Sequence, residues 1–376
     1  MKITNIKASI VAIPFKKPGL YLLGAKEPEQ SYKFVFVEMF TDEGVKGIGV
    51  QKDLSGVTVN IIEKTIKDFL IERHISPFNT EMISELLRRV EMHSGQCSAV
   101  EIAAWDIIGK VTGMPISKLL GGYRDQIKVY ISTGELKTSS ERIEEIEGYI
   151  EQGIKAIKLK AHHSNYKEDI KHVQDIKDYF GDKIEIMVDG YRAQKTESSF
   201  PPPWTRNEAL EIARSLEECG VLWLEEPLPI YDKEGLAELC AKVDIYIAGG
   251  EAEYGIYTFK EFLERKIYDI IQCDVTLSGG FMETKKIASM AQAFGKWCIP
   301  HAWSVGPGII ANLHLCCAIP NCPYFEYVKE SPAFNIDVRD AIISEPLLIK
   351  NGYVKLPSGP GLGVEINYDV INKYKI

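Results

Sequence analysis

Eight short apolar runs recur between residues 127 and 326, and this repeat limits the possible folds more than any other feature of the chain. The runs are IKVYIST, AIKLK, IEIMVD, VLWLE, IYIAGGE, YDIIQCD, KWCIPH and PYFE. Helical patterns such as NEALEIARSLEECG lie between them and end at or near a glycine, as helix C-termini often do. The repeat predicts a parallel α/β barrel, whose strands are apolar throughout because both of their faces are buried.

The two ends of the chain show different patterns. Residues 1–126 contain three strand patterns, ITNIKASIVAI, YKFVFVEMFTD and GVKGIGVQ, with a predicted hairpin turn at TDEG. Helical patterns follow near 57–71, 80–91 and 97–113, so we expect an α+β domain here. Residues 335–376 contain strands and turns but no barrel helix. We therefore expect a (β/α)7β barrel over 127–334, and a tail over 335–376 that completes the N-terminal domain.

Composition excludes several classes of partner. The net charge of −9 argues against a nucleic-acid or anionic-membrane partner. We find no apolar stretch of membrane-spanning length and no signal-peptide pattern at the start. The eight cysteines are scattered without CxxC pairs, which predicts reduced, buried thiols in a cytoplasmic protein.

Most of the apolar runs end in an ionisable residue. These residues are Lys160, Asp189, Glu225, Glu251, Asp274, His301 and Glu326. The C-terminal strand ends of such a barrel form the floor of the active site. Carboxylates clustered there would repel one another, so we expect a cation among Asp189, Glu225 and Glu251. Carboxylate oxygens suit Mg2+, whereas zinc would require histidine or cysteine ligands.

Two lysines stand in KAIKLKAHHS, residues 155–164. Lys158 and Lys160 point to the same face if the run is a strand, because strand side chains alternate. A solvated strand edge would be the ordinary explanation for such a pair. The barrel interpretation instead places both ammonium groups in the interior, beside the carboxylates.

The ordered set of strand-end motifs resembles the enolase superfamily, and within it the mandelate racemase/muconate lactonizing enzyme family. The motifs are KLK (158–160), VDG (188–190), WLEEP (223–227), GGE (249–251), CD (273–274) and PH (300–301). The resemblance covers nearly the whole chain and implies that the terminal regions form a capping domain. It implies that Asp189, Glu225 and Glu251 bind an essential Mg2+. Glu226 follows Glu225 on the strand, so we expect it to point to the opposite side and to be structural.

The resemblance also implies catalytic roles. Lys160 would be the base that removes the proton α to a substrate carboxylate, and Lys158 would lower the pKa of Lys160 and help to hold the substrate. Asp274 and His301 match a dyad in which the aspartate fixes the tautomer of the imidazole. Glu326 matches a glutamate that donates a hydrogen bond to the enolate when protonated.

Two reactions follow from bases on opposite sides of a substrate. With His301 as general acid, loss of the β-hydroxyl would convert an aldonate or aldarate into a 2-keto-3-deoxy acid. With His301 returning a proton to the α carbon, the chain would be a racemase or epimerase. We favour the acid sugar dehydratase and give less weight to a cycloisomerase, a dipeptide epimerase or a non-catalytic member of the family. Enzymes of this family usually assemble, so we also expect a homo-oligomer that acts on small carboxylates.

Five further residues are candidates for substrate binding. Tyr191 and Arg192 follow Asp189 directly, where a second carboxylate or a polyol could be held, with a surface arginine as the equal alternative. Trp204 belongs to the additional segment 193–205, whose three prolines predict a stiff wall of the pocket. Tyr21 lies in the early loop 14–30, which would close over the substrate. His162 follows the lysines, and a solvated loop is the alternative for it.

Overall fold

The computed structural model describes residues 1–16, 30–52, 56–94, 96–161, 163–196, 198–199, 202–331 and 333–376. Its N-terminal part begins with an antiparallel sheet of β1 (Ile3–Pro14), β2 (Ser31–Thr41) and β3 (Lys46–Lys52), in the order β1-β2-β3. The predicted hairpin joins β2 to β3, and the N–H of Gly44 donates to the carbonyl of Thr41 at 3.2 Å. All three predicted strands are therefore confirmed.

The three predicted helical regions are also present. The first is α1 (Val57–Ile61), a π-helical turn (Ile62–Ile66) and α2 (Lys67–Glu72), and it is followed by α3 (Thr80–Ser94), α4 (Ser98–Thr112) and the short α5 (Ile116–Leu119). Helix α4 lies directly on β3, because Gly47 and Gly49 have no side chains to hold it away. A Cβ atom at Gly49 would lie 1.9 Å from the carbonyl oxygen of Ala99. Apolar side chains therefore bury α4 on nearly all sides.

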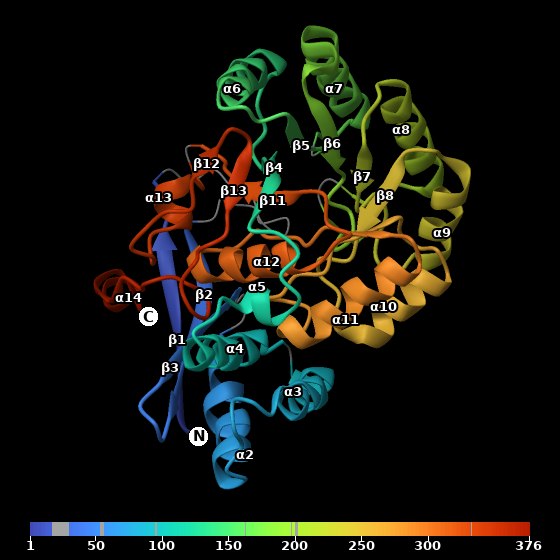
Figure 1. Ribbon diagram of the computed structural model, residues 1–376. Coiled ribbons are helices and arrows are strands. Elements are labelled where there is room, and N and C mark those ends of the chain that lie inside the picture. The colour runs from blue at the N-terminus through green and yellow to red at the C-terminus, as the bar shows by residue number, and fades with distance from the viewer. Residues whose placement is uncertain are drawn as a thin grey trace.

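Eight strands and seven helices alternate over the described part of the barrel (Figure 1). The strands are β4 (Gln126–Ser132), β5 (Ala156–Lys160), β6 (Glu185–Asp189), β7 (Trp223–Glu225), β8 (Tyr246–Gly249), β9 (Ile270–Ile271), β10 (Trp297–Cys298) and β11 (Phe325–Val328). The helices are α6 (Ser139–Glu151), α7 (Tyr166–Phe180), α8 (Arg206–Glu218), α9 (Lys233–Lys242), α10 (Gly255–Glu264), α11 (Gly280–Ala293) and α12 (Gly306–Ala318). Capping boxes at Thr138/Glu141 and Thr205/Glu208 fix where α6 and α8 begin.

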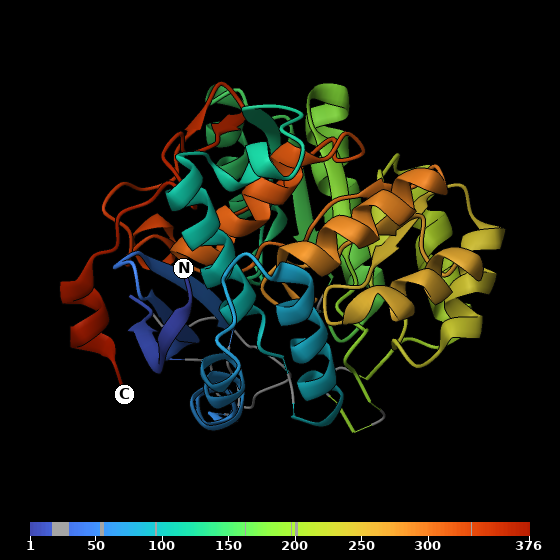
Figure 2. The same cartoon turned by 60° about the horizontal axis from the view of Figure 1, so that its bottom comes forward.

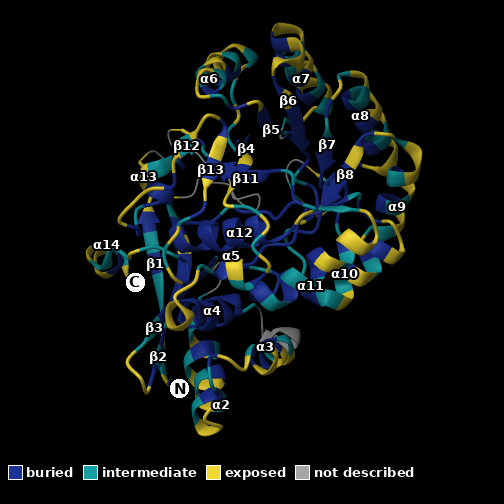
Figure 3. Ribbon diagram, viewed as in Figure 1, coloured by how far each residue is buried: buried dark blue, intermediate teal, exposed yellow. Residues whose placement is uncertain are grey.

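The parallel sheet runs in the order β10-β9-β8-β7-β6-β5-β4, and β11 pairs with β4 on its far side. Within the described residues no ladder joins β10 to β11, but the N–H of Cys298 donates to the carbonyl of Asn321 at 2.9 Å. Figure 3 shows that the strands are buried. The barrel interior is filled by the side chains of Tyr130, Ala156, Met187, Trp223, Ala248, Ile270, Ile299 and Tyr324. The predicted (β/α)7β barrel is confirmed.

The C-terminal tail contacts both parts of the chain. It contains α13 (Ile336–Arg339), β12 (Ile349–Lys350), β13 (Tyr353–Lys355) and α14 (Tyr368–Tyr374). Strand β13 pairs antiparallel with β4 at the start of the barrel, whereas Lys375 forms a bridge with Val11 of β1. The hydroxyl of Tyr368 also donates to Glu38 of β2 at 3.0 Å.

A buried carboxylate joins the capping domain to the barrel. Glu101 of α4 accepts the N–H groups of Phe281 and Met282, in the first turn of α11, at 2.7 and 3.0 Å. The indole N–H of Trp105 donates to the same carboxylate at 2.7 Å. Figure 2 shows α3 and α4 lying against α11. Because barrel helices begin on the side where the strands end, this contact holds the cap beside the mouth of the barrel.

All eight cysteines are free thiols. Among the described residues, no helix is both long and apolar enough to cross a membrane.

Candidate active site

The predicted strand-end residues come together on one edge of the barrel. Lys160, Asp189 and Glu225 are the last residues of β5, β6 and β7, and they lie in register across the three paired strands. The others lie on or just beyond the following strands: Glu251, Asp274, His301 and Glu326. Side-chain contacts join them in three groups, which are Lys160 with Asp189, Lys158 with Glu225 and Glu326, and His301 with Glu251 and Asp274.

Lys158 occupies the buried part of the site. Its Nζ atom donates to Oε1 of Glu225 at 2.6 Å and lies 2.9 Å from Oε1 of Glu326. Burial alone would lower the pKa of this lysine, but the two carboxylates outweigh it and raise the pKa well above the usual value. Lys158 is therefore a fixed cation that neutralises two carboxylates.

Lys160 is nearer the surface of the site, with a side chain 13% exposed. Its Nζ atom lies 3.6 Å from Oδ2 of Asp189 and 3.9 Å from the centre of the Tyr191 ring. Burial lowers the pKa of Lys160, but nearby negative charge, that of Asp189 first, raises it overall. Lys158 lowers the pKa of Lys160 as expected, but its effect is smaller than that of Asp189, so the expected net fall toward neutral pH is not found.

The three predicted metal ligands have different partners. Oδ1 of Asp189 accepts the N–H of Tyr191 at 2.8 Å, and Oε2 of Glu225 accepts the side-chain amide of Gln272 at 2.7 Å. Burial raises the pKa of Glu225 to about 7, and the charge of Asp189 adds to the rise while Lys158 opposes it. Glu251 contacts Nε2 of His301 at 3.5 Å.

This donor set fits Mg2+. Within the described residues, no three His, Cys, Asp or Glu side chains are arranged to hold a metal ion as they stand. The chemistry is nevertheless suitable, because the carboxylates of Asp189, Glu225 and Glu251 raise the pKa values of their neighbours by repulsion. Carboxylate oxygens are the donors that Mg2+ prefers.

The predicted dyad is present. Nδ1 of His301 lies 2.8 Å from Oδ2 of Asp274. Oδ1 of Asp274 accepts the N–H and hydroxyl of Thr276 and the amide of Asn312, at 2.7 to 2.8 Å. These donors hold the aspartate rigidly, so it fixes the proton of the imidazole on Nδ1 and leaves Nε2 facing the site. Burial lowers the pKa of His301, but Glu251 and then Glu326 outweigh it and raise it to about 9.

Glu326 differs from its expected state. Burial raises its pKa, but Lys158 and then His301 outweigh that effect and lower the pKa to about 2. Its Oε2 atom also accepts the N–H of Ala302 at 2.6 Å. The expectation of a protonated Glu326 is therefore wrong here, because the ammonium group of Lys158 stabilises the ionised carboxylate.

Glu226 lies just beyond the end of β7. Burial raises its pKa well above the usual value, and the charges of Glu251 and then Asp189 add to the rise. Its φ angle of +46° takes the chain out of the strand, so the alternation of side chains ends at Glu225. Strand alternation therefore does not extend to Glu226, and the expectation that it points away from the site stays a prediction.

Arg192 and Trp204 lie behind the strand ends. Arg192 is only 1% exposed, so the surface alternative is wrong. Its Nη1 atom donates to the carbonyls of Gly190 at 2.6 Å and Ala161 at 3.3 Å, and its guanidinium stacks on Trp204, 4.3 Å from the ring centre. A Cβ atom at Gly190 would lie 2.9 Å from that ring. Trp204 is therefore buried against Arg192 and Gly190, and its role as a wall of the pocket stays a prediction.

Two predicted substrate-binding residues, Tyr21 and His162, lie outside the described residues. Conversely, sequence reasoning missed Trp303, whose ring centre lies 5.5 Å from Nζ of Lys160 and which stacks on Phe334 at 5.8 Å. The hydroxyl of Tyr32, in the capping sheet, donates to the carbonyl of Trp303 at 2.9 Å. The sequence signal that could have identified Trp303 is its position two residues after His301.

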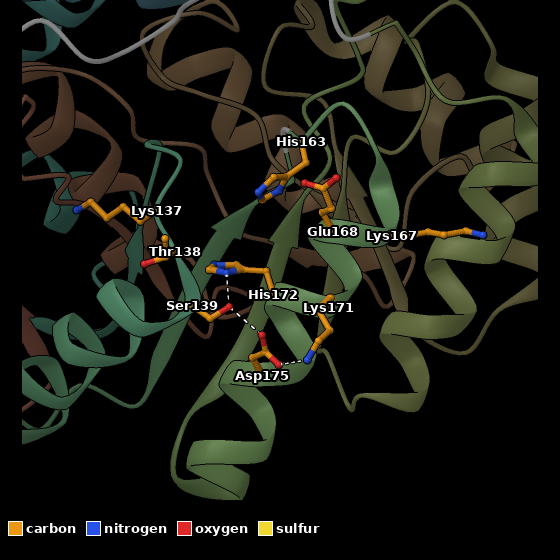
Figure 4. Close-up of a pocket in the computed structure, with 9 residues that line it drawn as sticks. All are labelled: Lys137, Thr138, Ser139, His163, Lys167, Glu168, Lys171, His172 and Asp175. Carbon is orange, nitrogen blue, oxygen red and sulfur yellow. Dashed lines mark hydrogen bonds and ion pairs between the residues drawn. The ribbon is translucent and has the colours of Figure 1, made fainter.

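A second cleft, of about 290 Å³, lies between α6 and α7 (Figure 4). Its lining contains none of the described strand-end residues, and consists of Lys137, Thr138, Ser139, His163, Lys167, Glu168, Lys171, His172 and Asp175. The hydroxyl of Ser139 donates to Asp175, which also pairs with Lys171.

Comparisons with known proteins agree with this geometry. Residues 22–121 match the mandelate racemase/muconate lactonizing enzyme N-terminal domain, and residues 141–370 match the enolase C-terminal domain-like family. The chain is 33% identical to an arabinonate dehydratase from Saccharolobus solfataricus, over 92% of each chain. It is 30% identical to a D-galactarolactone cycloisomerase from Agrobacterium fabrum, over 91% of each chain.

A solved structure has the same fold. It is the structure of a protein from Bordetella bronchiseptica RB50, complexed with 2-oxoglutarate/phosphate. That structure aligns with the present chain with a TM-score of 0.87 and 30% identity, over 100% of the present chain and 98% of the Bordetella chain. The family models together span most of the chain, on both sides of the boundary between cap and barrel. The chain therefore belongs to the mandelate racemase/muconate lactonizing enzyme family of the enolase superfamily.

Proposed function

We propose that this protein is a Mg2+-dependent dehydratase of a sugar acid, an aldonate or aldarate. The observation that carries the proposal is the placement of two proton-transfer groups around one carboxylate cluster. Lys160 lies beside Asp189, whereas Nε2 of His301 lies beside Glu251. A substrate carboxylate at the cluster would have its α carbon between the two groups.

Asp189, Glu225 and Glu251 would hold the ion. Mg2+ bound there would offset the charge that develops on the substrate carboxylate as the α proton leaves. With the charge of Asp189 offset by the ion, Lys160 would lose the interaction that raises its pKa and could remove that proton. Its position over the Tyr191 ring limits the directions in which Nζ can point. Lys158 neutralises Glu225 and Glu326 and so stabilises the buried side of the site.

His301 would be the general acid of the proposed dehydration. Its bond to Asp274 orients the ring and supports the protonated form. A protonated Nε2 can deliver its proton to the β-hydroxyl as that group leaves, which gives an enol and then a 2-keto-3-deoxy acid. The similarity to an arabinonate dehydratase supports this outcome.

The second candidate is an isomerase. Return of the proton to the α carbon would give a racemase or epimerase by the same pair of bases. The similarity to a D-galactarolactone cycloisomerase supports an isomerase that acts on a lactone, a class to which the sequence alone gave less weight.

The test is a panel of aldonates, aldarates and sugar-acid lactones incubated with enzyme and Mg2+ in D2O. A 2-keto acid that reacts with semicarbazide is the expected product. Deuterium at C2 without a keto acid would instead support a racemase or epimerase, and ring opening of a lactone would support a cycloisomerase. Lys160→Ala is the control, since it is expected to remove both exchange and product while the circular dichroism spectrum remains that of the folded protein.

A further inference from the structure

Trp303 has a shielded indole N–H group without an acceptor. Its side chain is partly exposed, but its Nε1 atom is covered and makes no hydrogen bond within the described part of the chain. Nε1 of Trp105, by contrast, donates to Glu101 at 2.7 Å. A covered donor without an acceptor costs free energy, so its retention beside the site requires an explanation.

The Trp303 ring reaches across the mouth of the barrel. Trp303 follows β10, whereas Lys160 ends β5, and β11 and β4 lie between these strands on the shorter way round the barrel. Nζ of Lys160 nevertheless lies 5.5 Å from the centre of the Trp303 ring. In the proposed function the α carbon of the substrate lies next to this Nζ atom. The ring therefore borders the space that a bound sugar acid would occupy.

Contacts from the barrel and the cap hold Trp303 in this position. The N–H of the preceding Ala302 donates to Oε2 of Glu326 at 2.6 Å, and the carbonyl of Trp303 accepts the hydroxyl of Tyr32 at 2.9 Å. The ring stacks on Phe334, with ring centres 5.8 Å apart and an angle of 21° between the planes. Trp303 is therefore oriented before a substrate binds, which lowers the cost of any contact that it makes.

We propose that Trp303 binds the substrate, and that its indole N–H donates to an oxygen of the sugar acid beyond C3. The inference rests on the proposed function, because it requires a hydroxylated carbon chain beside Lys160. The C1 carboxylate, the C2 carbon and the C3 hydroxyl are assigned to the Mg2+ site, Lys160 and His301, so oxygens further along the chain are left for Trp303. The residue thus favours long polyol acids over short ones. The structural alternative is that its ring only packs against Phe334.

Trp303→Phe removes the N–H group and keeps an aromatic ring on Phe334. The two acids to compare are the sugar acid of the panel above that wild type converts fastest, and glycerate, which has no oxygen beyond C3. The KM of the sugar acid should rise about threefold to tenfold, the effect of one lost hydrogen bond. The Ki of glycerate as a competitor should change clearly less. Equal changes for the two acids would overturn the inference.

The proton resonance of the Trp303 indole gives a direct readout on the wild-type protein. The chain has five tryptophans, so each indole signal can be assigned by substitution. Adding the sugar acid with Mg2+ should move the Trp303 signal downfield, because its N–H gains an acceptor, and should leave the Trp105 signal in place. A Trp303 signal that stays in place would overturn the inference.

Trp105→Phe is the matched control. It removes an indole N–H that already has an acceptor, the buried Glu101 in the contact between cap and barrel. It should therefore lower the melting temperature and leave the KM of the sugar acid unchanged. A structural role for Trp303 predicts the same pattern for Trp303→Phe, namely a lower melting temperature with no preference between the two acids.

The outcomes separate this inference from the proposed function. Wild-type protein that converts a sugar acid, with equal changes for both acids in Trp303→Phe, would overturn the inference and leave the proposed function standing. Wild-type protein that converts none of the sugar acids in the panel would overturn the proposed function and this inference with it.

Discussion

The ammonium group of Lys158 and the carboxylate of Glu225 form a buried ion pair at 2.6 Å, and neither side chain is more than 3% exposed. The same lysine lies 2.9 Å from Glu326. One cation thus neutralises two carboxylates beneath the proposed substrate position. Lys160, two residues along the same strand, has a longer contact of 3.6 Å with Asp189.

Lys158→Met should therefore destabilise the protein severely. Removing one member of a buried ion pair leaves the other charge uncompensated, and the expected loss in the free energy of unfolding is about 3–5 kcal/mol. Urea denaturation measures it. Lys160→Met is the matched control, and its loss should be clearly smaller, although it should abolish α-proton exchange. Equal losses for the two variants would contradict the assignment of a structural cation and a catalytic base.

Asp274→Asn tests the dyad. An asparagine amide would donate to Nδ1 of His301, so the imidazole proton would move to Nε2 and the ring would face the substrate in the wrong tautomer. The expected fall in kcat/KM is about tenfold to a hundredfold or more. Nitrogen NMR of the labelled imidazole reports the tautomer directly. Thr276→Val removes a different donor to Asp274 and should leave the tautomer unchanged.

Because His314 is buried in its neutral form, we expect the protein to lose stability in acid. It is fully buried, accepting the N–H of Ser117 and donating to the carbonyl of Leu362, and burial lowers its pKa to about 4. Between pH 6.5 and 4 the unfolded chain binds a proton that the folded protein does not, so stability falls as pH falls. The loss is about 3 kcal/mol in total and levels off below pH 4. Denaturation from pH 8 to 4 should show a shallower slope for His314→Asn, and an identical slope would contradict this account.

Gly280→Ala tests the contact between cap and barrel. Gly280 has a φ angle of +82°, and a Cβ atom there would lie 2.2 Å from Oε2 of Glu101. Gly295→Ala is the control, because Gly295 has a φ angle of +69° but open space around it. The control should cost about 1–2 kcal/mol through strain alone. The loss for Gly280→Ala should be larger, and equal melting temperatures would show that Glu101 moves aside freely.

The barrel could be predicted because its signals are local. Each apolar run is short and lies between helical patterns, and the order of Lys160, Asp189 and Glu225 along the chain is also their order across the sheet. Parallel strands therefore convert a regular sequence spacing into spatial proximity. The strand-end residues were found for this reason alone.

The sequence-based expectations failed where tertiary contacts determine the environment of a side chain. Strand alternation cannot be extended to Glu226, because a positive φ angle ends it after Glu225. A surface position was left open for Arg192 as an equal alternative, whereas Arg192 is buried and stacks on Trp204, twelve residues further on. The state of Glu326 depends on Lys158, which is distant in sequence. No local pattern encodes these pairings.

Glu101 limits how far the cap can move from the barrel. Hinged rotation of the whole cap away from the barrel would strip two N–H groups in the first turn of α11 of their acceptor. Such a motion is costly, so we expect the cap and the barrel to move as one body.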